Sequence, residues 1–182
     1  SPADGHPQAL PITRQDEIGE LIAAFNRLLA ALGEREVALT ESEYRWKFAI
    51  EGSGDGLWDW NNADNAVFLS RRWKAMLGYA DEEIRGSFDE WEQRIHPEDK
   101  ATTLAKVQGY LDGSIPVYLN EHRMRCKDGS YKWILARGMV VGRDGNGHPM
   151  RIIGTHSDIN DRIHAENSLR MSEERFRKAF YI

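Results

Sequence analysis

The stretch Gly-Leu-Trp-Asp-Trp-Asn at residues 56–61 decides how the chain folds. Two tryptophans flank an aspartate there, so bulky and polar side chains alternate with the period of two that is typical of a β-strand. Residues 61–64 then supply Asn and Asp, which favour turns, and the apolar run Ala-Val-Phe-Leu follows at residues 66–69. We therefore predict strands over residues 57–60 and 66–69, joined as a hairpin.

Three longer β segments occupy the second half of the sequence, at residues 117–126, 131–141 and 150–159. Asp-Gly pairs stand between them at residues 128–129 and 144–145. An Asp-Gly pair between two apolar runs is a strong hairpin signal, because both residues accept the positive φ angles that tight turns need. The three segments are therefore predicted to be consecutive antiparallel strands.

The region between these two groups of strands carries helical signals. Ser70 is a good N-cap for a helix through Leu77, and residues 81–85 favour a further helical turn. Pro97 suits the first turn of a helix that would run to Asp112. The resulting order, β-β-α-α-α-β-β-β, predicts an α+β fold, in which a five-stranded antiparallel sheet has its helices on one side.

The composition of the 182 residues is that of a globular protein, with 41% hydrophobic and 29% charged residues. The formal net charge of −5 gives no reason to expect nucleic acid as a partner. Cys126 is the single cysteine, so an intrachain disulfide is excluded and a reducing setting is expected. The sequence contains no run of about 18 apolar residues, so we expect no membrane span within it. It also contains no catalytic motif, so we expect this segment not to be an enzyme.

A seven-residue repeat of apolar side chains precedes the strands. Its core positions are Ile18, Leu21, Phe25, Leu28, Leu32, Leu39 and Trp46. Such a repeat predicts a coiled coil between two copies of the chain, with these residues as the dimer seam. Arg35 and Ser42 are poor core residues, so the seam is expected to be weaker there. A long amphipathic helix packed on its own domain is the alternative.

The order of elements, the Trp-rich first strand and the His-Pro-Glu-Asp step at residues 96–99 resemble a PAS domain of the PAS fold-3 type. Residues 158–162, Asp-Ile-Asn-Asp-Arg, are similar to the Asp-Ile-Thr-Glu-Arg exit motif of that family. The resemblance implies that Asp158, Asn160 and Arg162 couple the sheet to an exit helix. Asn160 stands where Thr is usual and lacks its methyl group, so we expect an altered rather than an abolished coupling.

The residues ahead of this region resemble the second half of a HAMP linker. Residues 10–27 contain Leu-Pro, Asp-Glu-Ile-Gly and Ala-Phe-Asn-Arg, which carry the resemblance. HAMP linkers are dimeric four-helix units that follow the last membrane span of bacterial receptors and kinases. The resemblance therefore implies a membrane-anchored parent protein, with this segment on the cytoplasmic side of the inner membrane.

Residues 42–50 recur 130 residues later, at residues 172–180, with Ser, Glu, Arg and Ala in the same places. A repeat at this distance predicts a tandem array in which a second PAS domain begins near the end of the sequence. The PAS resemblance covers residues 42–162. The expected division is a linker (1–12), a partial HAMP second helix (13–33), a coiled-coil connector (34–50), the PAS domain (51–162), and an exit helix with the start of a second PAS domain (163–182).

The PAS resemblance implies a ligand pocket between the inner face of the sheet and the helices. The candidate pocket residues are Trp58, Trp60, Trp73, Met76, His122, Met124, Ile134 and His156. An aromatic-rich set of this kind also suits plain core packing. His156 could report pH or bind a ligand, and it could equally be a core histidine whose hydrogen bonds are satisfied.

The candidate pocket residues do not indicate a particular cofactor. Cys126 lies beside a hairpin tip, whereas light-sensing PAS domains carry their reactive cysteine in the helical segment. Met124 and Ile134 stand where those relatives have flavin-binding asparagines, and residues 97–112 lack a histidine that could ligate b-type haem. Neither a cysteinyl flavin nor a b-type haem is expected. The pocket is expected to hold no cofactor or an unidentified small molecule.

These features predict a sensory and signal-relay module of a bacterial transmembrane signalling protein. As a homodimer, it would pass a conformational signal through its coiled-coil helices to a C-terminal output. By family analogy that output is a diguanylate cyclase or phosphodiesterase, and otherwise a histidine kinase. The alternatives are a ligand-free PAS dimerisation module and a redox sensor with a non-covalent flavin.

Overall fold

The computed structural model describes residues 17–180. The chain divides into two compact units, Ser1–Ala49 and Ile50–Ile182. The first contains most of a long helix, and the second contains a five-stranded sheet, the helices that cover it and a C-terminal helix. Among the described residues, the helices are too short or too polar to cross a lipid bilayer.

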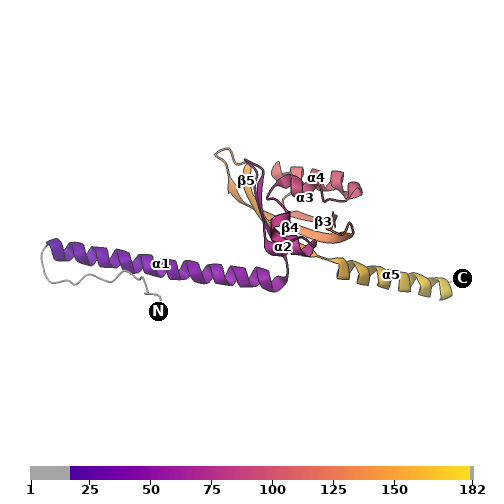
Figure 1. Ribbon diagram of the computed structural model, residues 1–182, viewed down its shortest axis with the longest axis horizontal. Coiled ribbons are helices and arrows are strands. Elements are labelled where there is room, and N and C mark those ends of the chain that lie inside the picture. Colours follow the sequence, from indigo (N-terminus) through magenta and orange to yellow (C-terminus); the bar gives the residue numbers. More distant parts are fainter. Residues whose placement is uncertain (1–16, 181–182) are drawn as a thin grey trace. The chain divides into compact units, whose positions relative to one another are not determined.

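Helix α1 runs without a break from Glu17 to Ser53 (Figure 1). It passes through the predicted boundary between residues 33 and 34, so the backbone does not mark the end of the HAMP-like part. The seven residues of the predicted dimer seam all have exposed side chains, from 45% for Phe25 to 69% for Leu21. The coiled coil itself stays a prediction, because one chain leaves this apolar stripe without a partner helix.

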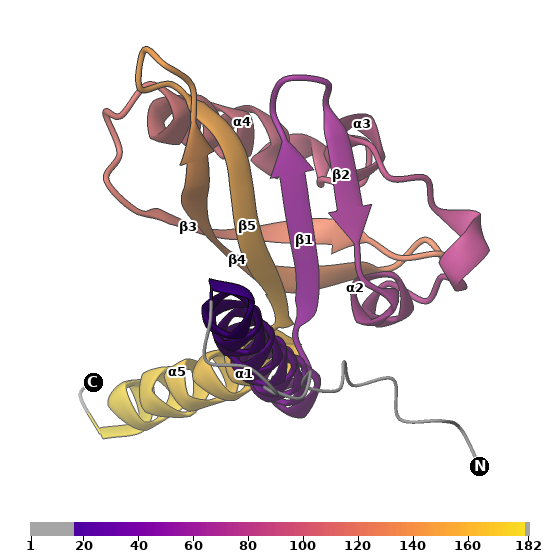
Figure 2. The same cartoon turned by 90° about the vertical axis from the view of Figure 1, so that its left-hand side faces the viewer.

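Five antiparallel strands form the sheet, in the order β2-β1-β5-β4-β3 (Figure 2). The pairing places the first hairpin beside the last strand, and the predicted α+β fold with a five-stranded antiparallel sheet is confirmed. The strands are β1 (Gly56–Asn61), β2 (Ala66–Leu69), β3 (Tyr118–Arg125), β4 (Tyr131–Arg143) and β5 (Pro149–Asp158).

Short helical segments connect β2 to β3, and Figure 2 shows α3 and α4 on the same face of the sheet. Helix α2 begins after Ser70, whose hydroxyl accepts hydrogen bonds from the amides of Trp73 and Leu57 and so ties the helix start to β1. The segments are α2 (Arg71–Met76), the 3-10 turn η1 (Asp81–Glu83), α3 (Phe88–Glu92) and α4 (Pro97–Leu111).

Helix α3 is absent from the prediction, which expected only one helical segment between residues 78 and 96. Its five residues are too few to show a 3.6-residue period, so periodicity could not reveal it. The available signal was Ser87, whose side chain caps the helix, followed by the acidic residues Asp89 and Glu90 in its first turn. This short helix matters because it carries Trp91 into the core.

Helix α4 is fixed to the sheet at its N-terminus. His96 is its N-cap and accepts a hydrogen bond from the amide of Glu98 at 3.2 Å, which agrees with a structural role for this histidine. Asp99 accepts hydrogen bonds from the backbone amide and the guanidinium of Arg123 on β3. These bonds hold the pKa of Asp99 below its usual range, so its carboxylate stays ionised.

Candidate functional site

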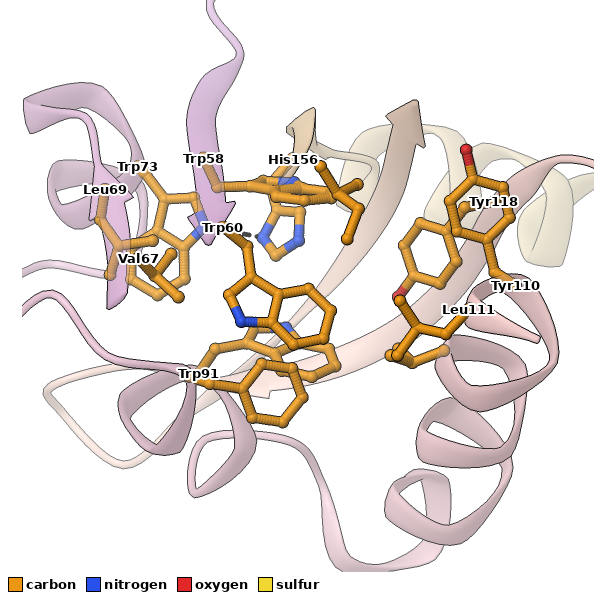
Figure 3. Close-up of a pocket in the computed structure, with 13 residues that line it drawn as sticks. Trp58, Trp60, Val67, Leu69, Trp73, Trp91, Tyr110, Leu111, Tyr118 and His156 are labelled. Carbon is orange, nitrogen blue, oxygen red and sulfur yellow. Dashed lines mark hydrogen bonds between the residues drawn. The ribbon is translucent and has the colours of Figure 1, made fainter. Parts of the chain in front are cut away.

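A cavity of about 50 Å³ lies between the inner face of the sheet and the helices (Figure 3). Aromatic and aliphatic side chains from β1, β2, β3, β5, α2, α3 and α4 line it. Of the eight predicted pocket residues, Trp58, Trp60, Trp73 and His156 are in this lining. Asp, Glu, Lys and Arg are absent from the described residues that line it.

The other four predicted pocket residues lie in the core but outside the cavity lining. Met124, Ile134 and His122 are completely buried, and Met76 is nearly so. Met124 sits near the end of β3, where its backbone bridges to Ile95 just before α4. The strand alternation placed His122 and Met124 on the correct face of the sheet, but only the packing of the helices decides which part of that face borders the cavity.

The position of Trp58 depends on two glycines in the neighbouring strands. Trp58 pairs with Gly154 of β5, and Gly154 pairs with Gly138 of β4. A Cβ atom on Gly138 would come within 2.6 Å of the indole, and one on Gly154 within 2.2 Å. The indole therefore lies over a surface that only glycine leaves open. The indole also meets two rings edge to face, that of Tyr118 with centroids 6.3 Å apart and that of His156 with centroids 6.1 Å apart.

His156 is buried on β5 and bonded to Trp73 of α2. The indole Nε1–H of Trp73 donates to Nδ1 of His156 at 2.8 Å, which Figure 3 marks with a dashed line. Because an indole nitrogen only donates, Nδ1 of His156 is the acceptor and Nε2 carries the proton of the neutral ring. Burial, together with the nearby His122, lowers the pKa of His156 well below its usual value.

The tautomer of His122 follows from a chain of hydrogen bonds in the core. Lys106 donates to Oδ1 of Asn120 at 2.9 Å, so the amide nitrogen of Asn120 faces the other way. That nitrogen lies 3.1 Å from the hydroxyl of Thr103 and 3.2 Å from Nδ1 of His122. Nδ1 of His122 therefore accepts, and Nε2 carries the proton. Burial lowers the pKa of His122 to about 4, so the ring is neutral at neutral pH.

Buried N–H donors around the cavity lack acceptors. Among the described residues, the indole nitrogens of Trp58, Trp60 and Trp91 and the Nε2 atom of His122 are buried without a hydrogen-bond partner. A buried donor without an acceptor costs about 1–3 kcal/mol, so four of them in one region call for an explanation. The lining is therefore mainly apolar and uncharged, and it contains several N–H groups without hydrogen-bond acceptors.

Several residues of the site were not predicted. Phe88 and Trp91 come from the unpredicted helix α3, and Phe88 stacks between Trp91 and Trp60 with ring centroids 5.0 and 4.7 Å away. Tyr118 and Asn120 alternate with period two along β3 and share the buried face of His122. That alternation is visible in the sequence and could have identified both residues.

The predicted coupling residues gather where β5 passes into helix α5 (Asn160–Phe180). The carboxylate of Asp158 accepts from the amide of Asn160 at 3.0 Å and contacts the ammonium group of Lys132 at 2.8 Å. The side-chain oxygen of Asn160 accepts from the amide of Trp133 on β4 at 3.0 Å. The carbonyl of Trp133 in turn accepts from the amide of Ile159. Two hydrogen bonds to one residue thus attach the start of α5 to β4.

Arg162 makes the third contact between α5 and the sheet. One nitrogen of its guanidinium lies 2.6 Å from Glu121 on β3, and the other lies 3.1 Å from Glu166, one turn further along α5. Each of these side chains is at least 41% exposed, so the ion pairs are expected to contribute modestly to stability. They do give the first turn of α5 a contact with a second strand.

The cavity is small for a ligand pocket. Its volume of about 50 Å³ is far below the roughly 300–1,000 Å³ of pockets that hold drug-sized ligands. Met124 and Ile134 are completely buried and offer no hydrogen bond to a flavin edge. Among the described residues, no cluster of three His, Cys, Asp or Glu side chains is placed to hold a metal ion.

Known families and structures resemble this arrangement. The family model described as PAS fold (PAS_3) matches residues 66–156. A crystal structure of a sensory box histidine kinase/response regulator from Burkholderia thailandensis is 35% identical, with a TM-score of 0.65, and the match covers 74% of this chain and 98% of that one. The N-terminal domain of a diguanylate cyclase with PAS/PAC sensor from Marinobacter aquaeolei is 26% identical, with a TM-score of 0.54 and coverage of 60% and 99%.

Curated relatives are much longer than this chain. The non-motile and phage-resistance protein of Caulobacter vibrioides is 30% identical over 89% of the chain, which spans 20% of that protein. The probable diguanylate cyclase DgcE of Escherichia coli is 29% identical over 68% of the chain and 11% of its own length. The sheet, the covered cavity and the exit helix define a sensory domain of a signalling protein. The chain belongs to the PAS-fold family.

Proposed function

We propose that this chain is the sensory and signal-relay module of a larger bacterial signalling protein. Occupancy of the cavity changes the position of β5, and the contacts at residues 158–162 pass that change to α5. The observation that carries the proposal is the placement of His156: it lines the cavity, and it lies on the same strand as Asp158, two residues away. An output attached beyond α5 would respond to the orientation of this helix.

The relay is tested by replacing Asp158 with Ala and measuring amide hydrogen exchange. The carboxylate of Asp158 accepts from the amide of Asn160 and pairs with Lys132, so its loss should loosen the first turn of α5. We expect exchange after Ile163 to become about fivefold or more faster, while the strands stay protected. The sheet remains folded because its ladder does not use this side chain.

Asp144 supplies a matched control for this experiment. Its carboxylate accepts from the amide of Asn146 in the β4–β5 hairpin, the same local geometry at the opposite end of β5 from α5. Asp144→Ala should leave exchange in α5 unchanged. Equal protection of α5 in Asp158→Ala and in the unaltered protein would remove the coupling role.

We further propose that the parent protein has an output domain, a HAMP linker and a membrane anchor. Relatives named as a diguanylate cyclase and as histidine kinases support an output of one of these two kinds. We favour a diguanylate cyclase or phosphodiesterase output, with a histidine kinase as the alternative. The HAMP resemblance of residues 10–27 supports a parent anchored in the inner membrane with this module on the cytoplasmic side.

A ligand-free dimerisation module is the second candidate function. The apolar seam of α1 is exposed in a single chain, which favours a role in contacts between copies. Such a role does not require a ligand in the cavity. Native mass spectrometry of the freshly purified protein, with an absorbance spectrum of the same sample, separates the two functions. Extra mass that is released on denaturation supports a sensor, and a yellow colour would indicate the flavin redox sensor. A dimer of bare protein mass counts against a ligand sensor and favours the ligand-free module.

A further inference from the structure

The unpartnered donors around the cavity narrow the chemistry of its ligand, and the following inference rests on the proposed sensory function. Trp58, Trp60 and Trp91 all line the cavity, and each is at least nine-tenths buried. Their indole nitrogens are buried without a hydrogen-bond partner among the described residues. A buried donor without an acceptor is unfavourable, so the site is stabilised by any occupant that accepts from it.

Acceptors are scarce in the same lining. Nδ1 of His156 is already used by Trp73, and the other nitrogen of His156 is a donor. The remaining polar atoms are the hydroxyl groups of Tyr110 and Tyr118, and that of Tyr110 already accepts from the amide of Val140 at 3.0 Å. The lining side chains therefore offer more donors than acceptors.

This excess of donors disfavours water as the occupant. A buried water molecule makes two to four hydrogen bonds and must donate in some of them. Around this cavity a water molecule could accept from an indole, but it would find few atoms to receive its own hydrogens. A molecule that accepts and does not donate matches the lining better.

The charge of the lining bears on the charge of the ligand. Asp, Glu, Lys and Arg are absent from the described lining residues, and apart from His156 the lining consists of Trp, Tyr, Phe and aliphatic side chains. An ion taken from water into such a site loses its hydration without gaining a counter-charge, which is strongly unfavourable. His156 and His122 are kept neutral by burial, so they supply no positive charge at neutral pH.

The volume limits the size of the ligand. A cavity of about 50 Å³ has room for roughly three to five water-sized groups, given 10–15 Å³ for each. The three indole nitrogens without partners are shielded from solvent, so a ligand must displace a ring slightly to reach them. Movement of Trp58 would act on Gly154 of β5, against which its indole is packed.

We propose that the cavity binds a small, uncharged, mainly apolar molecule whose polar atom is a hydrogen-bond acceptor, such as a carbonyl oxygen, and that the indole N–H groups of Trp58, Trp60 and Trp91 recognise it. Acetone represents this class as a probe. Acetate has nearly the same size and shape but carries a negative charge, so it is the matched comparison.

The test is a titration of ¹⁵N-labelled protein, in which the indole ¹H–¹⁵N signals are followed one by one. Replacing each tryptophan in turn by Phe assigns the signals. Acetone should move the signals of the three cavity tryptophans downfield in a saturable way, and acetate at equal concentration should not. Trp58→Phe should weaken acetone binding about fivefold, the effect of one lost hydrogen bond, and Trp133→Phe, outside the cavity lining, should leave it unchanged.

Two outcomes would overturn this inference. Saturation by acetate at or below the acetone concentration would mean that the ligand is an anion. Absence of a saturable shift with either probe, with magnetisation transfer from water to the indole protons, would mean that the cavity is simply hydrated. Neither outcome bears on the relay, which the hydrogen exchange of Asp158→Ala tests without any ligand.

Discussion

Trp58 lines the cavity and packs on the neighbouring strands at two glycines, where there is no room for a Cβ atom. Its indole lies over Gly138 and Gly154, which sit side by side on β4 and β5. Because β5 continues to Asp158 and then to α5, a shift of this ring would act on the strand that leads to the exit helix. The two glycines thus belong to the site although neither carries a side chain.

Gly138→Ala tests this contact. The added methyl group would lie 2.6 Å from the indole of Trp58, so we expect a loss of about 1–3 kcal/mol in the free energy of unfolding. Urea denaturation measures it. Gly142→Ala is the matched control on the same strand, because there the nearest atom is 3.4 Å away, and its cost should be under about 0.5 kcal/mol.

A double-mutant cycle shows whether Trp58 is the cause of that loss. In a Trp58→Leu background the indole is gone, so Gly138→Ala should cost less than half of its effect in the unaltered protein. Equal costs in both backgrounds would contradict the contact and point to the strand backbone instead.

At the scale of elements, α5 is bonded to the sheet, whereas the apolar residues of α1 remain exposed. The first turn of α5 is bonded to β4 through Asn160 and to β3 through Arg162. Asn160 accepts with its side-chain oxygen, so the side chain that replaces the usual Thr still bonds the strand. Helix α1 instead presents apolar residues that stay exposed in a single chain. This contrast supports a role for α1 in contacts between copies.

Leu32→Asp combined with Leu39→Asp tests the seam of α1. Each leucine is more than half exposed in one chain, so the substitutions should leave the PAS domain folded. In a dimer they would bring four carboxylates into the apolar seam. We expect the sedimentation coefficient to fall from that of a dimer to that of a monomer, because charges in the seam of a coiled coil oppose association.

The control for this experiment places the same charges on the opposite side of the heptad. Ala30 and Val37 occupy outer positions, so Ala30→Asp with Val37→Asp should keep the dimer. An unchanged sedimentation profile for the seam variant would rule out the coiled coil and favour a helix that packs elsewhere.

At the scale of the whole molecule, two buried neutral histidines make stability depend on pH. His122 and His156 have ring centroids 5.7 Å apart, and burial lowers the pKa of both. Burial is the largest influence on the pKa of His122 and lowers it; Asp99 and the backbone of Asn120 raise it by less, and Lys106 lowers it further. In the unfolded chain both histidines take up a proton near pH 6.5, whereas in the folded protein they resist it.

The unfolded state therefore binds more protons than the folded state below about pH 6.5. Stability is fully present above that pH and falls as the pH drops toward about 4. The slope should reach about 1.4 kcal/mol per pH unit for each histidine. Urea unfolding at several pH values across this window measures it.

His156→Gln should lower the slope by the share of one histidine, because glutamine does not titrate. His148→Gln, at a histidine whose side chain is mostly exposed, is measured beside it for comparison. A stability that does not vary between pH 6.5 and 4.5 would contradict the buried, neutral state of both rings.

The amino-acid sequence by itself determined the strands, their hairpins and the exit motif. These features depend on local physics: alternation of side chains along a strand, hairpin tips in which a glycine (Gly129 and Gly147) takes the positive φ angle, and a serine that caps a helix. The same alternation placed His122, Met124 and His156 on the buried face of the sheet. Helix α3 was not predicted, because five residues are too few to show a helical period.

Only the tertiary structure decided which buried side chains border the cavity and which of their donors are unused. Trp58 meets Gly138 and Gly154 across more than 75 residues of sequence, and the tautomer of His156 depends on Trp73, which is 83 residues away. Such contacts result from how β1, β5 and the helices pack together, and no local pattern records them. The sequence could name the aromatic set, but hydrogen bonding between distant elements gives the site its chemistry.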